Sequence, residues 1–114
     1  MQVAQEALDA RTRVVSVTGE LVGSTGLRLV RFAKTALDEA AERLIVDLTA
    51  MTFMDSGGLA ALIATWSAAA DRRARFAVVL KPDSHALRSL ELRGVAGVFA
   101  VASTREDALT QLGD

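Results

Sequence analysis

Short runs of apolar and β-branched residues alternate along this chain with longer stretches in which apolar residues recur at helical spacing. Residues 14–19 and 43–48 predict two strands, and residues 75–80 and 98–101 predict two more. Residues 1–7 can pair with the first of these strands through a short turn. The runs are separated by glycine-containing or polar segments, which favours compact strands over one continuous helix.

Helices are predicted between the strands. Residues 27–42 carry Val30, Ala33, Leu37 and Ala40 at helical spacing, after a loop at 19–26 that contains three glycines. An apolar helix over 59–71 starts near Ser56, a short helix starts at Pro82 and closes near Gly94, and the run Ser103-Thr104-Arg105-Glu106 predicts a capping box that opens a last helix with Ala108, Leu109 and Leu112 inward.

This alternating order predicts an α/β fold in a single domain of residues 1–114. We expect a sheet of four or five strands, mixed but mostly parallel, covered by four helices. A chain of 114 residues is long enough to bury a core without disulfides or metals.

The composition excludes several classes of function. A net charge of −1 gives no overall attraction to nucleic acid or to anionic membranes. There is no cysteine, so thiolate nucleophiles and zinc–cysteine sites are excluded, and a cytoplasmic location is expected. No run approaches the roughly 20 apolar residues of a membrane span, and no signal peptide is recognisable. His85 is the only histidine, and we expect it to be solvated. No catalytic site, metal site or cofactor is therefore expected.

The segment 53–59 is the most informative part of the chain, because it joins an apolar strand to the apolar helix. A serine at this position, Ser56, suits a helix N-cap, and it equally suits a covalently attached phosphate at the positive end of the helix dipole. Gly57 and Gly58 allow either a phosphate cradle or close packing of the helix. A P-loop is excluded, because no Lys-Ser/Thr pair follows.

Two surfaces are candidates for partner binding. The helix after Ser56 has a bulky face and a face of small residues, and we expect the small face, which includes Ala60, Ala61, Ala64 and Ala68, to be at least partly exposed as a docking surface. The helix at 27–42 has basic residues in its first half, Arg28 and Arg31 among them, where the helix dipole disfavours them. These arginines form a candidate patch for an acidic partner or its nucleotide.

Three motifs resemble the STAS domains of bacterial anti-sigma factor antagonists: Phe53-Met54-Asp55-Ser56 with Gly58 and Leu59, Gly19-Glu20-Leu21, and Leu90-Glu91-Leu92 with Gly94, Val95 and Phe99. The resemblance spans nearly the whole chain. It implies a small cytoplasmic binding module that is not an enzyme. Its partner would be an anti-sigma factor that is a serine kinase and phosphorylates Ser56, next to Asp55. A metal-dependent serine phosphatase would remove the phosphate.

Two departures from this family pattern keep an alternative open. Gly57 stands where many switch-type members have a second serine or threonine, and Val22 stands where many have an aspartate. Both favour a STAS scaffold that is not phosphorylated, as a subunit of a transporter or another assembly. A small nucleotide-binding or hydrolytic α/β enzyme is a third hypothesis, against which the missing catalytic clusters argue.

Overall fold

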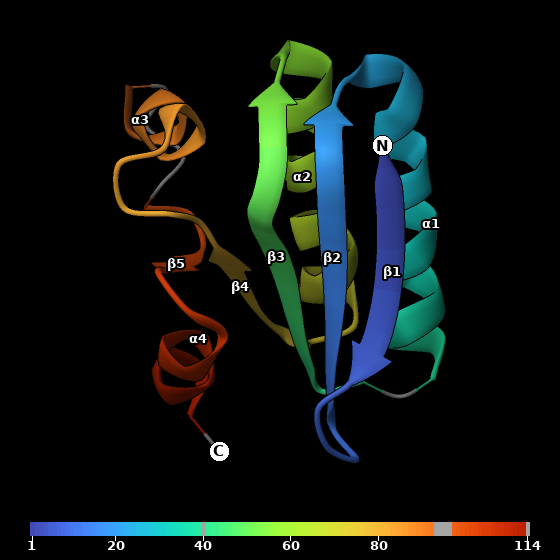
Figure 1. Ribbon diagram of the computed structural model, residues 1–114. Coiled ribbons are helices and arrows are strands. Elements are labelled where there is room, and N and C mark those ends of the chain that lie inside the picture. Colours follow the sequence, from blue (N-terminus) through green and yellow to red (C-terminus); the bar gives the residue numbers. More distant parts are fainter. Residues whose placement is uncertain (40, 93–96, 114) are drawn as a thin grey trace.

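The computed structural model describes residues 1–39, 41–92 and 97–113 and contains one five-stranded sheet in the order β1-β2-β3-β4-β5 (Figure 1). The strands are β1 (Gln2–Ala7), β2 (Thr12–Leu21), β3 (Arg43–Met54), β4 (Arg75–Val79) and β5 (Ala100–Ala102). The helices are α1 (Gly23–Asp38), α2 (Ser56–Asp71), α3 (His85–Leu92) and α4 (Arg105–Leu112). Strand β1 is antiparallel to β2 and the other pairs are parallel, so the predicted α/β class and mixed sheet are confirmed.

The alternation of side chains along β3 divides the core between the two faces of the sheet. Leu44, Val46 and Leu48 are buried in the main cluster beneath α1 and α2, which lie side by side behind β1–β3 in Figure 1. Ile45 points to the other face, where Ala108 and Leu112 of α4 pack. Among the described helices, α4 alone packs on that second face. The helices therefore cover the face beneath α1 and α2 fully and the face beneath α4 only in part.

The first helix begins earlier than expected, because the glycine-containing stretch is not a loop. Strand β2 runs to Leu21 and α1 starts at Gly23. A Cβ atom on Gly26 would lie 2.6 Å from the Cβ of Ala61, so this glycine allows α1 to approach α2 closely. Helix α1 ends at Asp38 rather than at residue 42. Ala40, which belongs to the predicted stripe, lies outside the described residues.

Strand β3 is longer than predicted, because its partner β2 continues beside it. The register runs as far as Leu21 opposite Met54, whereas pairing with β4 ends at Asp47 opposite Val79. Residues 49–54 of β3 are therefore paired along one edge. This asymmetry shapes the carboxyl end of the sheet, where parallel α/β folds place their binding sites.

The elements of the C-terminal third differ by one to three residues from the prediction, and α3 begins at His85 rather than at Pro82. The last strand is Ala100–Ala102 instead of 98–101. Thr104, not Ser103, caps α4, and its Oγ1 accepts a hydrogen bond of 3.0 Å from the amide of Asp107. The predicted end of α3 at Gly94 lies outside the described residues.

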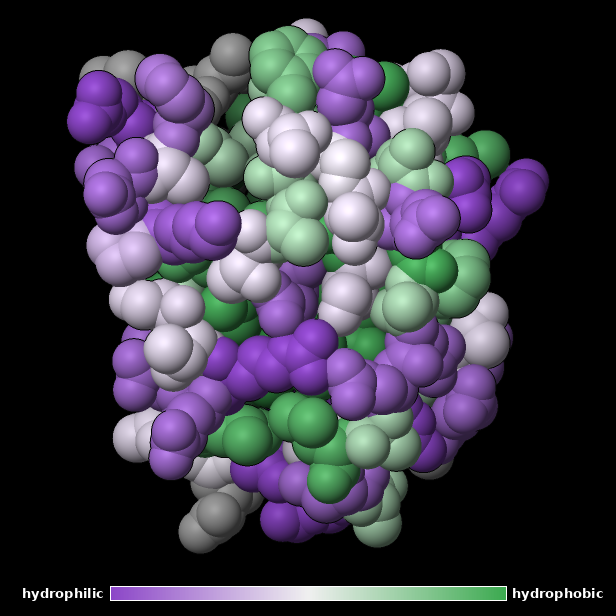
Figure 2. All heavy atoms as spheres, viewed as in Figure 1, coloured by the Kyte–Doolittle hydropathy of each residue, from purple (hydrophilic) through white to green (hydrophobic). Residues whose placement is uncertain are grey.

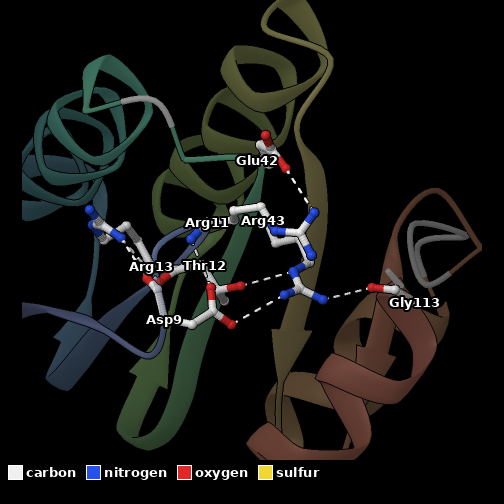
Figure 3. Close-up of polar contacts among 7 residues, drawn as sticks. All are labelled: Asp9, Arg11, Thr12, Arg13, Glu42, Arg43 and Gly113. Carbon is white, nitrogen blue, oxygen red and sulfur yellow. Dashed lines mark hydrogen bonds and ion pairs between the residues drawn. The ribbon is translucent and has the colours of Figure 1, made fainter.

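Arg43 ties the strands together at the opposite, amino end of the sheet (Figure 3). Its Nε donates to Thr12 Oγ1 at 2.8 Å, and its two terminal nitrogens donate to Asp9 Oδ2 at 3.2 Å and to the carbonyl of Gly113 at 2.7 Å. One guanidinium group thereby joins β3 to the β1–β2 turn and to the end of α4, far along the sheet from Ser56.

Candidate functional site

The turn between β3 and α2 is held by backbone hydrogen bonds and by one side chain. The amide of Asp55 donates to the carbonyl of Leu21 at 3.3 Å, which joins the turn to the end of β2. Asp55 Oδ1 accepts a hydrogen bond of 2.8 Å from the amide of Gly58 and caps α2. The turn is therefore fixed by Asp55 and the sheet, without a contribution from the neighbouring serine.

Ser56 is the first residue of α2 and its side chain is exposed. Of the two interpretations of Ser56 that the sequence leaves open, the helix cap does not apply, because Asp55 accepts the hydrogen bond from the amide that a cap would bind. No hydrogen bond joins the Ser56 hydroxyl to another described residue. The hydroxyl therefore projects into solvent at the positive end of α2, where an anionic group is stabilised.

The two glycines after Ser56 are packing residues. A Cβ atom on Gly58 would lie 2.0 Å from the carbonyl oxygen of Leu21, and one on Gly57 would lie 2.5 Å from Cα of Gly23. No other residue fits at either position without movement of the backbone. Close packing is thus confirmed for Gly58, and the same constraint explains why a second serine or threonine is missing at position 57.

Val22 precedes α1 at the position where many family members have an aspartate. Its side chain cannot cap the helix, and Thr25 takes part in that role instead: Thr25 Oγ1 accepts a hydrogen bond of 3.2 Å from the amide of Val22. Thr25 therefore binds the backbone of Val22, while the side chain at position 22 adds neither a cap nor a negative charge at the start of α1.

The expected small face of α2 is only partly exposed. Ala60 and Ala64 are exposed as predicted, but Ala61 is 9% exposed and packs against Gly26 of α1, so the prediction of an exposed Ala61 is wrong. Ile63, a bulky apolar residue of α2, is 38% exposed. The exposed residues of α2 from Ser56 to Ser67, called here the outer face, are Ser56, Ala60, Ile63, Ala64 and Ser67. The error arises because α1 packs on the residues beside Leu62, which sequence periodicity cannot locate.

Arg28 and Arg31 are both exposed on α1, as a binding patch requires. Arg28, however, donates a hydrogen bond of 2.9 Å to the carbonyl of Met1, at the edge of the sheet. Each helical residue turns by about 100°, so Arg28 points away from the side on which Gly26 contacts α2. Both arginines are therefore exposed on α1, and Arg28 differs from Arg31 in that it is bound to the N-terminal residue.

A polar cluster that the sequence did not reveal lies on the partly covered face of the sheet. Arg105 Nε donates to Asp47 Oδ2 at 2.8 Å, and another nitrogen of Arg105 donates to Ser16 Oγ at 3.0 Å. Arg105 also pairs with Glu6 on β1. The only signal in the sequence is a lone aspartate in an apolar strand, since its partner is 58 residues away. Asp47 lies within β3, and its carboxylate accepts hydrogen bonds from Thr49 and from Arg105.

The hydrogen bonds of this cluster set the ionisation of Asp47. Burial by itself would raise the pKa of the carboxyl, but hydrogen bonds from the backbone and hydroxyl of Thr49 and from Arg105 outweigh it, so the pKa of Asp47 lies below its ordinary value. The carboxylate is thereby held ionised against β4 and α4. The cluster joins β1, β2, β3 and α4, which makes it a structural tie.

The described residues can also be compared with what a metal site or a membrane-spanning helix requires. His85 is exposed, as expected. Within residues 1–39, 41–92 and 97–113, no group of three or more histidine, aspartate or glutamate side chains could hold a metal ion. None of the helices described here is both long enough and apolar enough to cross a membrane.

Comparison with known proteins decides the family. The family model described as "Mlab, STAS domain" matches residues 4–103. The structure of an anti-sigma factor antagonist from Mycobacterium paratuberculosis is similar with 30% identity and a TM-score of 0.85, over 99% of this chain and 94% of that one. The chain belongs to the STAS-domain family of anti-sigma factor antagonists. No curated protein matches this STAS domain.

Two further solved structures share the fold of this STAS domain. The Bacillus cell fate determinant SpoIIAA in its phosphorylated form is 21% identical, with a TM-score of 0.70 over 98% of this chain and all (100%) of that one. A sulfate transporter family protein from Wolinella succinogenes is 15% identical, with a TM-score of 0.73 over 94% of this chain and 88% of that one. At these identities the likeness concerns the fold, and the function has to be argued from the site.

Proposed function

We propose that this STAS domain acts in the cytoplasm as an anti-sigma factor antagonist, which binds a serine-kinase anti-sigma factor and is released when that kinase phosphorylates Ser56. The observation that carries the proposal is that two adjacent residues of the turn have different roles. Asp55 caps α2, and the Ser56 hydroxyl is exposed beside it. Phosphorylation of Ser56 would therefore cost no structural hydrogen bond and would add its charge at the positive end of the helix.

The outer face of α2 supports a binding role for the surface next to Ser56. Ala60 and Ala64 are exposed with Ile63 between them, and Ser56 lies at the end of this row. Small and apolar side chains allow a partner to approach the helix closely. A phosphate on Ser56 would add a charge of about −1.5 to −2 at the margin of that contact, and desolvation and repulsion would then oppose binding.

The proposal can be tested by incubating the domain with a serine-kinase anti-sigma factor from the same genome. Incubation with this kinase and ATP should add one phosphate to the wild-type domain, which peptide mass spectrometry should locate at Ser56. Ser56→Ala should bind the kinase as the unphosphorylated wild type does and should resist phosphorylation. Ser56→Asp should bind at least tenfold more weakly, or by about 1.4 kcal/mol. A metal-dependent serine phosphatase should reverse the modification.

Ser67 provides the matched control, because it is exposed on the same face of α2. Eleven residues separate Ser67 from Ser56, which corresponds to about 16 Å along the helix. Ser67→Asp adds the same charge away from the turn and should change binding less than Ser56→Asp does. Equal binding of wild type, Ser56→Ala and Ser56→Asp would rule out the switch.

A second candidate function is a scaffold that is not phosphorylated, in a transporter or another assembly. Positions 57 and 22 favour the scaffold, because Gly57 and Val22 both differ from the pattern of switch-type members. Gly57 packs closely against Gly23, and Val22 precedes α1 without a side-chain cap. The shared fold with a sulfate transporter family protein is compatible with the scaffold. Co-purification with a transporter subunit, together with no phosphorylation of Ser56, would decide for the scaffold.

A further inference from the structure

A pocket of about 680 Å³ lies at the carboxyl end of the sheet, between the end of β3 and α3. It arises because β4 stops pairing at Asp47 opposite Val79, while β3 continues to Met54. The chain then leaves β4 at Leu80 and enters α3 at His85, which leaves the outer edge of residues 49–54 without a neighbouring strand. The volume lies within the range of about 300–1,000 Å³ that is common for small-molecule sites.

Flexible aliphatic side chains make up much of the pocket wall. Leu48, Met51 and Met54 come from β3, Leu80 follows β4, and Ala86 belongs to α3. Methionine is adaptable and fits irregular apolar ligands without demanding one shape. Of Phe, Tyr and Trp, only Phe53 is among the described residues of the wall, and it is 52% exposed. The lining therefore favours an aliphatic chain over a flat ring.

The polar residues of the wall are three hydroxyl residues, Thr49, Thr52 and Ser84, and three basic residues. Lys81, His85 and Arg88 line the pocket, and no acidic residue is among the described residues that do so. None of these three side chains forms an ion pair within the described ranges, and all three are exposed. In Figure 2 hydrophilic residues gather over α3, beside more apolar residues over the upper end of β3. On a chain of net charge −1, this local excess of positive charge is complementary to an anion.

We propose that this pocket binds a single-chain amphiphile with an anionic head group. The carboxylate or phosphate of the head would pair with Lys81 and Arg88 at the mouth. The aliphatic tail would lie against Met51 and Met54. The site does not involve Ser56 and goes beyond the proposed function, so its test needs no kinase partner.

The methionines provide a direct test by nuclear magnetic resonance. The chain has three methionines, of which Met51 and Met54 line the pocket and Met1 does not. With the methionine methyl groups labelled, titration with dodecanoate or dodecyl phosphate below the micelle concentration should shift the signals of Met51 and Met54 in a saturable way and leave Met1 unchanged. Binding of one head group or of both would support the proposal and would identify the preferred anion.

Charge variants separate this site from general adsorption of detergent. Lys81→Ala and Arg88→Ala should each weaken dodecanoate binding severalfold and together at least tenfold, whereas Arg31→Ala, on exposed α1, should not. Dodecanol, which has the same chain without a charge, should bind at least tenfold more weakly than dodecanoate. Equal binding of dodecanol, an absence of shifts with both anions, or shifts of Met51 and Met54 with ATP but not with dodecanoate would overturn the proposal.

Discussion

Asp55 Oδ1 accepts a hydrogen bond of 2.8 Å from the amide of Gly58, so the residue before Ser56 caps α2. This relationship separates two roles that sequence alone could assign to the same serine. The structural role belongs to Asp55, and Ser56 is left exposed for chemistry at the start of the helix.

Replacement of the cap should therefore destabilise the domain, and replacement of the serine should not. Asp55→Ala removes the acceptor for the Gly58 amide and should lower the free energy of unfolding by about 0.5–2 kcal/mol. Ser56→Ala removes an exposed hydroxyl and should change it by no more than about 0.5 kcal/mol. Urea unfolding measures both. A loss for Ser56→Ala as large as that for Asp55→Ala would contradict the assignment of the cap.

Gly58→Ala should be among the most damaging small substitutions in the chain. Its Cβ would lie 2.0 Å from the carbonyl oxygen of Leu21, so the backbone of β2 or α2 has to move. Overpacking of this kind costs about 1–3 kcal/mol or more. Gly97→Ala is the matched control, because a Cβ there meets nothing within 4 Å, and it should have little effect on thermal unfolding. Similar melting temperatures for the two variants would show that α2 does not pack on β2 as described.

Two neighbouring alanines of α2 should respond differently to a charge. Ala61→Glu places an unpaired carboxylate against α1 and should cost about 3 kcal/mol or more, or prevent folding. Ala64→Glu changes an exposed position and should remain within about 0.5 kcal/mol of the wild type. Circular dichroism during urea titration distinguishes them. Under the proposed function, Ala64→Glu should also weaken kinase binding while the domain stays folded.

The cluster of Asp47 and Arg105 predicts a dependence of stability on pH. Because the folded pKa of Asp47 lies below its ordinary value of about 4, the ionised carboxylate stabilises the fold above that pH. The contribution is lost as the pH falls through the lowered pKa. At pH 7, Asp47→Asn should lower the free energy of unfolding by about 1–3 kcal/mol.

Below pH about 4, this difference between Asp47→Asn and wild type should shrink. Asp71 lies at the exposed end of α2, and Asp71→Asn is the control. Its free energy of unfolding should match that of the wild type at pH 7 and below pH about 4. Unfolding curves at several pH values check the prediction. A difference that stays constant from pH 7 to pH 3 would mean that Asp47 stabilises the fold by its shape and not by its charge.

The order of strands and helices could be predicted from the sequence. Apolar residues recur at a different spacing in a strand and in a helix when one face of the element is buried. Leu44, Ile45, Val46 and Leu48 are apolar because both faces of this part of β3 are buried. The spacing of Ala108 and Leu112 identifies the inner side of α4. The motif around Ser56 could also be recognised, because its residues are adjacent in the chain. These features depend on local spacing, and the sequence contains that information directly.

The tertiary structure decided which residues meet across long distances in the chain. Ala61 is buried because Gly26 of α1 brings the two helices together, Asp47 is ionised beside an arginine 58 residues away, and the pocket forms where β4 ends before β3 does. The same alanine-rich pattern on α2 is compatible with either an exposed or a buried Ala61. Whether Ala61 is exposed or buried depends on how α1 packs against α2. The spacing of residues within α2 does not show which other element contacts it.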